Sequence, residues 1–333
     1  MYNLTTNSCY IKIKIIHSGR VNMESFVMAA RVVLPMALMM SVGILLRVVK
    51  IADPATMKKM DTITFKVFSP CLVFYNIYNT DFSTLSNLGY LLYGIFGLCV
   101  VFAGCMALVP KFIPERPTAA AFSQSLVRPN FIIFGAAVAQ SIYGEGNIGL
   151  VMLMGAFAIP VYNVMAAVIL ESGRGAKSNP FQFLKAVLRN PIILATFLGI
   201  AVNLSGLRIP ELIDGVIADL GGITTPLSFV SIGVGLGVAA ASRKKLISSA
   251  LLLRLILIPL VILSGAVLLG FRGAELCGLM ILFAAPAAVA SYPAAVAMGA
   301  DGDFAGQMVA YSTIACLPTI FLWTLVLNTL QLL

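Results

Sequence analysis

Ten apolar segments recur along this chain of 333 residues, and they constrain its fold more than any other feature. Each is about 20 residues long or longer, the length of an α-helix that crosses a hydrocarbon core of roughly 30 Å, whereas a barrel strand needs only about 10 residues. Only 11% of the residues are charged, against roughly 25% in soluble domains. The sequence therefore predicts an all-α integral membrane protein. Its ten transmembrane helices are expected within residues 25–46, 57–79, 87–109, 119–141, 147–170, 190–208, 211–239, 246–270, 273–298 and 305–331.

The basic residues lie between the apolar segments rather than in one patch. Although the net charge is +9, this dispersed pattern argues against nucleic acid as a partner and indicates orientation in a lipid bilayer. The loops between helices on the opposite side contain only Arg208 and Arg272. Because positive loops stay in the cytoplasm, both termini are expected outside it. The thirteen basic residues assigned to the cytoplasmic side are Arg47, Lys50, Lys58, Lys59, Lys111, Arg116, Arg174, Lys177, Lys185, Arg189, Arg243, Lys244 and Lys245.

The first 22 residues do not follow this charge pattern. They carry Lys12, Lys14 and Arg20 on the side where basic residues are otherwise scarce, and they are too charged for the core of a signal peptide. Met23 stands just before the first apolar segment. We therefore expect residues 1–22 to be an N-terminal extension that is not native; the alternative is a genuine surface tail.

An internal repeat divides the remaining chain into two halves. Seven coincidences occur in order with one small change of offset, which makes chance a poor explanation. Five segments per half is an odd number, so the second half must enter the membrane from the opposite side, as in the inverted repeats of many secondary transporters. We expect the first five-helix repeat in residues 23–171, a cytoplasmic linker in 172–189 and the second repeat in 190–333. The coincidences are Pro35 with Pro191, Gly43 with Gly199, Pro54 with Pro210, Pro70 with Pro226 (preceded by Ser69 and Thr225), Ala136–Ala139 with Ala294–Ala297, Gly144–Glu145 with Gly302–Asp303, and Pro160 with Pro318.

The fourth and ninth segments are interrupted by prolines. The fourth contains Arg128, Pro129 and Asn130, and the ninth contains Pro286 and Pro293. Proline removes a backbone donor and breaks a helix. A broken backbone at membrane depth is tolerated only inside protein or along a polar cavity, and a cation there needs an anion or water. The two breaks therefore predict a binding site for an anionic solute where helices 4 and 9 meet.

These motifs together resemble those of the auxin efflux carrier family, which includes plant auxin carriers and bacterial permeases for malate and malonate. The resemblance runs from about Met23 to the C-terminus. Any one motif is weakly specific, whereas their order and spacing are fairly specific. The motifs are Ser69–Phe74, Arg128–Asn130 with Gly135, Ile159–Asn163, Asn190–Pro191, Pro226–Gly233 and Ala285–Pro293.

The resemblance implies a scaffold of helices 1, 2, 6 and 7, and a transport domain of helices 3–5 and 8–10 in which broken helices 4 and 9 cross. It also implies that small organic anions are carried by an elevator-like motion. In plant members an asparagine at each crossover helps to hold the carboxylate. Asn130 matches the first, but the second half has only Ser291 and Tyr292 near its prolines. This departure argues against auxin and favours a small mono- or dicarboxylate in a bacterial inner membrane.

Several candidate site residues can each be interpreted in two ways. Asn130 is expected to face the site, although amides also join membrane helices. Arg128 could grip a carboxylate through two parallel hydrogen bonds or satisfy carbonyl groups freed by the break. Arg254 has the same ambiguity without a motif, which favours a structural role. The remaining candidates are Pro129, Pro286, Ser291, Tyr292, Pro293 and Asn163 for the substrate, and Pro70, Asn76, Pro226 and Ser228 for the scaffold wall.

The sequence says least about which ion would drive transport and which residue would bind it. A proton carrier would be a carboxylate at membrane depth, and Asp61, Asp214 and Asp219 all lie toward the starts of segments two and seven. Asp219 is the best of these candidates, but a surface position is the default expectation for it. Lys66 could attract anions or reach the membrane surface. The coupling ion is expected to be H+ or Na+, with no cofactor and no metal site.

Other classes of function fit the sequence less well. The one histidine, His17, lies in the N-terminal tail, so histidine-based catalysis and zinc sites are not expected within the membrane. An intramembrane enzyme would need a metal motif, a Ser–His pair or paired aspartates, and the apolar segments contain none of these. A channel, or a membrane sensor that uses the same anion site, remains an alternative to a transporter. A homodimer is one assembly compatible with the sequence.

Overall fold

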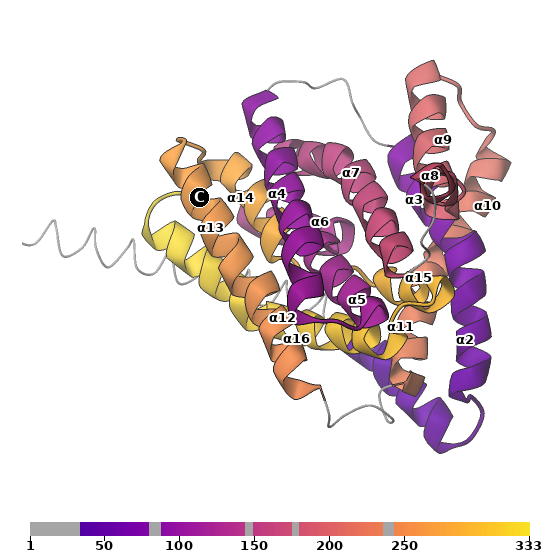
Figure 1. Ribbon diagram of the computed structural model, residues 1–333. Coiled ribbons are helices and arrows are strands. Elements are labelled where there is room, and N and C mark those ends of the chain that lie inside the picture. The colour runs from indigo at the N-terminus through magenta and orange to yellow at the C-terminus, as the bar shows by residue number, and fades with distance from the viewer. Residues whose placement is uncertain (1–33, 80–87, 144–148, 175–179, 236–242) are drawn as a thin grey trace, which may run out of the picture.

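The computed structural model describes residues 34–79, 88–143, 149–174, 180–235 and 243–333, and the regular structure in these ranges is helical apart from one isolated backbone bridge. The predicted extension of residues 1–22 lies outside the described ranges. The helices, shown in Figure 1, are Leu34–Val48, α2 (Pro54–Ile63), η1 (Thr64–Phe68), α3 (Ser69–Tyr78), α4 (Leu88–Phe112), α5 (Arg116–Val127), α6 (Phe131–Tyr143), α7 (Gly149–Gly173), α8 (Pro180–Leu188), α9 (Pro191–Ser205), α10 (Glu211–Gly222), α11 (Thr224–Gly235), α12 (Lys244–Leu252), η2 (Leu253–Leu257), α13 (Ile258–Leu268), α14 (Gly273–Ala284), α15 (Ser291–Met298) and α16 (Gly302–Thr329).

Five helices among the described residues are long and apolar enough to cross a membrane. They are Leu88–Phe112, Leu150–Gly173, Glu211–Gly235, Lys244–Leu268 and Gly302–Thr329. Three further apolar helices are shorter. A polypeptide that repeatedly places about 20 apolar residues in one helix is a multi-pass membrane protein, as the composition predicts.

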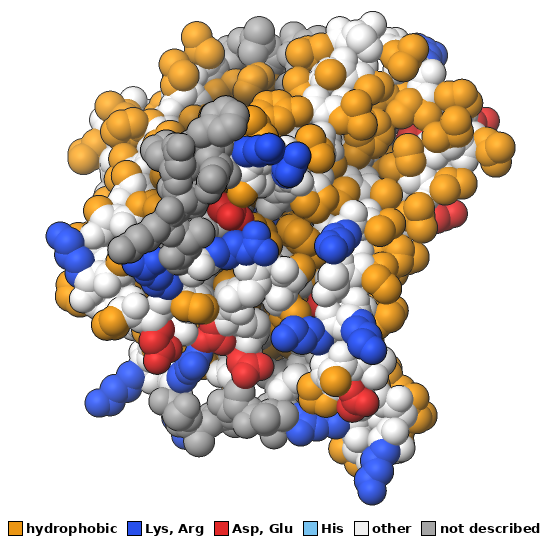
Figure 2. Space-filling view, turned by 45° about the vertical axis from the view of Figure 1, so that its right-hand side comes forward, with side chains coloured by type: hydrophobic (Ala, Val, Ile, Leu, Met, Phe, Trp, Pro, Cys, Tyr) orange, Lys and Arg blue, Asp and Glu red, His pale blue; other side chains and the backbone are white. Residues whose placement is uncertain are grey.

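The outer surface carries large hydrophobic side chains whose exposure to water would be unfavourable. Phe96, Leu212 and Leu268 are 65%, 82% and 87% exposed. Figure 2 shows such side chains over the upper and right-hand parts of one face, while most Lys and Arg side chains gather in its lower half. Apolar surface of this extent marks an interaction site, and here lipid is the medium that would cover it.

The two helices that precede the predicted breaks are the innermost ones. Every residue of α5 from Thr118 to Val127 is buried, and so is every residue of α14 from Leu276 to Ala284. A helix buried on all sides has no lipid-facing stripe and lies within the protein core. Both breaks are therefore enclosed by protein, the condition under which irregular backbone is tolerated at membrane depth.

The remaining helices form two packed groups. In one group, α3 packs against α9 and α10, on the right of Figure 1. Helix Leu34–Val48 crosses α11 so closely that a Cβ atom at Gly43 would overlap the Val230 carbonyl oxygen. In the other group, α7 packs against α4, α5 and α14. α15 contacts helices on two sides, because it packs against both α2 and α16.

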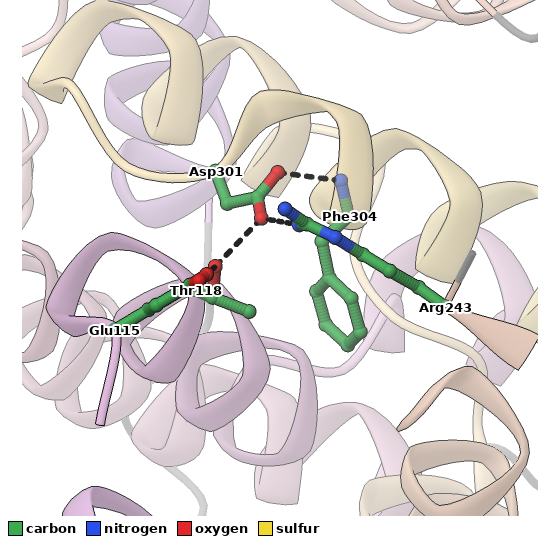
Figure 3. A network of polar contacts seen from close by, with 5 residues as sticks. All are labelled: Glu115, Thr118, Arg243, Asp301 and Phe304. Atoms are coloured by element: carbon green, nitrogen blue, oxygen red, sulfur yellow. Dashed lines mark hydrogen bonds and ion pairs between the residues drawn. The ribbon is translucent and has the colours of Figure 1, made fainter. Parts of the chain in front are cut away.

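A polar network joins three helix beginnings in the second group, as Figure 3 shows. The Asp301 carboxylate precedes α16 and accepts hydrogen bonds from the Phe304 amide at 3.0 Å and the Thr118 hydroxyl at 2.8 Å. It also forms an ion pair with Arg243, which precedes α12. The network therefore holds α5, α12 and α16 together at one end.

The segment predicted to be a linker contains a helix that the sequence analysis did not predict. The polar residues between Glu171 and Arg189 led us to expect only a linker, but α8 occupies its second part. α8 begins at Pro180, and proline is favoured at the first helical position because its missing N–H group would be unpaired there anyway.

Candidate functional site

The first break separates α5 from α6. Helix α5 ends at Val127, and Arg128 has the extended conformation, with φ −102° and ψ 99°. Pro129 cannot donate a backbone hydrogen bond, and its ring disfavours a helical conformation for the residue before it. The helix resumes at Phe131, so three residues form the break.

The second break is longer and lies directly against the first. Helix α14 ends at Ala284 and α15 begins at Ser291. An antiparallel bridge joins Pro129 to Ala287. In it the Asn130 amide donates to the Pro286 carbonyl at 2.8 Å, and the Ala288 amide donates to the Arg128 carbonyl at 3.0 Å. Each break thus satisfies backbone groups of the other, as buried peptide groups require.

Arg254 satisfies further carbonyl groups that the breaks leave free. Its guanidinium is 1% exposed. It donates from Nε to Ala285 at 2.9 Å, from Nη1 to Leu126 at 2.7 Å and from Nη2 to Leu282 at 3.5 Å. These carbonyls belong to the last turns of α5 and α14 or follow them, where the helix dipole is negative and a cation is favourable. Arg254 therefore has a structural role, as the sequence analysis preferred.

A cavity of about 120 Å³ opens beside the paired breaks. Its walls come from both breaks, from α3 and α7, and from the start of α11. The lining residues are Ser69, Leu72, Val73, Asn76, Arg128, Pro129, Asn130, Phe131, Ile159, Tyr162, Asn163, Thr225, Ala288, Val289 and Ala290.

The cavity gathers polar groups that find no hydrogen-bond partner among the described residues. The unpartnered atoms are Ser69 Oγ, Arg128 Nε, Asn130 Nδ2 and both amide atoms of Asn163. No ion pair reaches Arg128 within the described part of the chain, although its side chain is only 3% exposed. Unpaired buried polar groups are few in native proteins, and each needs an explanation. Most of these groups are hydrogen-bond donors, so the cavity suits a ligand rich in acceptors.

The predicted substrate residues divide between two places. Arg128, Pro129, Asn130 and Asn163 line the cavity. The second break contributes to the cavity through the backbone segment 288–290. The predicted residues that are not among the lining residues are Pro286, Ser291, Tyr292 and Pro293.

The predicted scaffold and coupling residues are also divided. Asn76 lines the cavity, whereas Pro70, Pro226 and Ser228 do not. Asp219 and Lys66 are exposed on their helices. A surface position was the default expectation for Asp219.

Four residues of interest lie where the sequence analysis did not place them. Ser69 and Thr225 line the cavity, and a signal for them existed, because each precedes one of the repeat-matched prolines. Tyr162 also lines the cavity and had no signal beyond its position in the Ile159–Asn163 motif. Asp61 is fully buried outside the cavity, although its position near the start of segment two suggested the membrane surface.

Comparisons with known proteins identify the family of the chain. The family model described as "Membrane transport protein" matches residues 28–324. A relative described as an uncharacterized transporter, from Methanothermobacter thermautotrophicus, is 23% identical over 322 residues, covering 91% of this chain and 99% of its own length. The resemblance inferred from the motifs is confirmed: the chain belongs to the membrane transport protein family, which is the auxin efflux carrier family.

Proposed function

We propose that this membrane transporter is a secondary carrier of a small mono- or dicarboxylate, which binds in the cavity beside the paired breaks. The observation that carries the proposal is the convergence of unpartnered donors from Ser69, Arg128, Asn130 and Asn163 on one cavity. An ionised carboxylate only accepts hydrogen bonds. Its bonds to a guanidinium are charge-assisted and roughly twice as strong as neutral ones.

The size of the cavity favours a small solute. Pockets for drug-sized ligands measure roughly 300–1,000 Å³, and this cavity measures about 120 Å³. The start of α6 lies at the cavity, since Phe131 is both its first residue and a lining residue. A helix N-terminus adds backbone donors and a partial positive charge, which an anion neutralises. These features favour a short-chain carboxylate over an aromatic acid.

The proposed mechanism is alternating access by an elevator-like motion of two inverted five-helix repeats. Each of the ten predicted segments overlaps one or more observed helices. The close packing of α3 with α9 and α10 supports a scaffold that includes these helices, and α7 packs against its α9. The Asp301 network supports movement of the transport domain as one body, because it links α5, α12 and α16. The two breaks would then carry the substrate across together.

The proposed location is a bacterial inner membrane with both termini outside the cytoplasm, because this orientation places the thirteen basic loop residues in the cytoplasm. The driving ion is proposed to be H+ or Na+. A transporter-like sensor or a channel that uses the same anion site is the competing proposal. Flux measurements distinguish these alternatives from a carrier, because a sensor binds the anion without flux and a channel conducts it without saturation.

Uptake into proteoliposomes tests the proposal. The probes are radiolabelled malonate, acetate and an aromatic acid, each with a pH or sodium gradient. We expect saturable malonate uptake driven by one of the gradients. Asn130→Ala should weaken malonate binding about 10- to 100-fold, since a hydrogen bond to a charged group contributes roughly 1.5–3 kcal/mol.

Asn79→Ala is the matched control, because Asn79 is an exposed residue at the end of α3 whose side-chain amide donates to the Tyr75 carbonyl and does not line the cavity. It should bind malonate as the wild type does. Malonate binding without flux would replace the carrier by the sensor. Equal affinity of the wild type and Asn130→Ala would remove the anion from this cavity.

A further inference from the structure

A second buried polar cluster lies away from the cavity, where α2, α11 and α15 meet. Asp61 is 0% exposed. It lies seven residues after the start of α2, which is about 10 Å along the helix. The Ser231 hydroxyl of α11 donates to Asp61 Oδ2 at 2.9 Å and lies 3.4 Å from the Tyr292 hydroxyl of α15. The Tyr292 hydroxyl also interacts with the Asp61 carboxylate, whose Oδ1 atom has no hydrogen-bond partner.

No cation neutralises Asp61 within the described part of the chain. The elements packed against α2 are α11, α15 and η1. Their sequences contain one charged residue, Lys66 of η1, whose side chain is exposed. Lys58 and Lys59 of α2 itself are exposed as well. Tyr292 is therefore the only titratable group that these elements direct at Asp61. A carboxylate this deep without a counter-ion is a functional candidate by default.

Tyr292 also lines a narrow hollow. The hollow measures about 20 Å³, and Asp303 and Gln307 are its other lining residues with polar side chains. This volume suffices for about one water molecule. Asp303 is exposed. The side chain whose hydroxyl interacts with Asp61 therefore shares a hollow with an exposed carboxylate.

We propose that Asp61 is the proton-binding site that couples a proton gradient to the motion of α15 against α2 and α11. The inference rests on the carrier proposed above and names its coupling ion. Ionised Asp61 interacts with hydroxyls of Ser231 and Tyr292 and so holds α15 in place. Moving α15 away would leave the buried charge with fewer donors, which is costly. A proton that arrives from water converts Asp61 to the neutral acid and reduces this cost. The proton returns to water when Asp61 ionises again.

The composition of the cluster favours a proton over a metal cation. The cluster supplies three residues with side-chain oxygens, one carboxylate and two hydroxyls. Hard cations such as Ca²⁺ and Mg²⁺ take about six or more oxygen ligands. One ionisable group with two neutral hydroxyls is sufficient for a proton and insufficient for a cage around a metal ion.

Transport in proteoliposomes gives the first test, with radiolabelled malonate as the probe. Asp61→Asn keeps the shape of the side chain but cannot ionise. We expect it to lose at least tenfold in accumulation driven by a pH gradient, while malonate exchange without a gradient persists. Asp219→Asn is the matched control, because Asp219 is an exposed aspartate on α10; its accumulation should equal that of the wild type. Unchanged accumulation by Asp61→Asn, or accumulation driven only by sodium, overturns the proposal.

Infrared difference spectroscopy gives a second test that needs no substrate. Titration of the detergent-solubilised wild type should reveal the carbonyl band of a protonated carboxylic acid, which Asp61→Asn loses and Asp219→Asn keeps. Tyr292→Phe retains Asp61 and should shift the pH at which the band titrates. A band unchanged in both Asp61→Asn and Tyr292→Phe overturns the proposal. If the band behaves as expected but malonate is not transported, the proton site stands and the proposed substrate fails.

Discussion

Two arginines are buried near the paired breaks, and their surroundings differ completely. Arg254 donates to three backbone carbonyls at the ends of α5 and α14. Arg128 lies within the first break and lines the cavity, and its Nε atom has no partner. Both side chains are at most 3% exposed. Burial of a cation in a membrane helix therefore does not by itself distinguish a structural residue from a binding residue. The two cations do differ in the hydrogen bonds that they make.

The difference between the two arginines follows from their positions in the chain. Arg254 lies in η2, on a helix that is not itself broken, and reaches the breaks from outside. It can satisfy carbonyls of both breaks without taking part in either. Arg128 instead belongs to the break, so its own backbone is held by Ala288, while its Nε atom has no partner among the described residues. The sequence analysis left both roles open for Arg128, and the proposed function assigns it to the ligand.

The largest effect is expected from Arg254→Ala. Three carbonyls would lose their donor, and each unsatisfied buried group costs roughly 1–3 kcal/mol. We expect loss of several kcal/mol of stability, measured as a large fall in the thermal unfolding midpoint and in the yield of monodisperse protein. Arg254→Lys should recover part of the loss, since one ammonium cannot reach all three carbonyls. Wild-type stability of Arg254→Ala would show that the breaks hold without this arginine.

Arg128→Ala is expected to have a smaller effect, which concerns ligand affinity and not stability. Removing an unpaired buried charge should leave the thermal midpoint unchanged or raise it, because the desolvation cost of that charge disappears. Malonate affinity should fall about 10- to 100-fold, the equivalent of roughly 1.5–3 kcal/mol for a charge-assisted hydrogen bond. Calorimetric titration measures the affinity and a thermal melt measures the stability. A large fall in stability with unaltered affinity would assign Arg128 to the structural side.

The smallest effects are expected from a matched pair of serines. Ser312 accepts a hydrogen bond from the Ala287 amide at 3.0 Å inside the second break, whereas Ser69 Oγ faces the cavity unpaired. Ser312→Ala should lower stability by about 1–3 kcal/mol through the orphaned amide and leave malonate affinity unaltered. Ser69→Ala should do the reverse and weaken affinity severalfold, since a neutral hydrogen bond contributes roughly 0.5–1.5 kcal/mol. Identical behaviour of the two variants in both assays would contradict the distinction.

The membrane class and the breaks could be predicted from the sequence because both depend on local chemistry. Apolar segments of about 20 residues specify helices in lipid, and Pro129 disfavours a continuous helix at its position. Proline alone does not decide, since Pro160 and Pro318 lie inside continuous helices. Asn130 and Arg128 could be placed at the site for the same reason, since they adjoin that proline. The family followed from the order of such motifs.

The second half of the site could not be predicted, because its placement depends on helix rotation. α15 has only eight residues and is apolar on nearly every side, so no amphipathic pattern indicates which face meets the cavity. Tyr292 consequently pairs with Ser231 and Asp61 instead of lining the cavity. The burial of Asp61 results from the contact of three helices far apart in sequence, which no single segment encodes.

The backbone pairing of the two breaks also has a consequence for biosynthesis. The carbonyl of Leu126 is bonded by Arg254, 128 residues further along the chain. A ribosome that adds about 5–20 residues per second needs roughly 6–26 s to make that stretch. During that interval the first break lacks both the hydrogen bond from Arg254 and the second break beside it. The nascent first half must therefore be sheltered by insertion machinery or by its own helices α4 and α7, and slowing translation after the first half should increase its degradation.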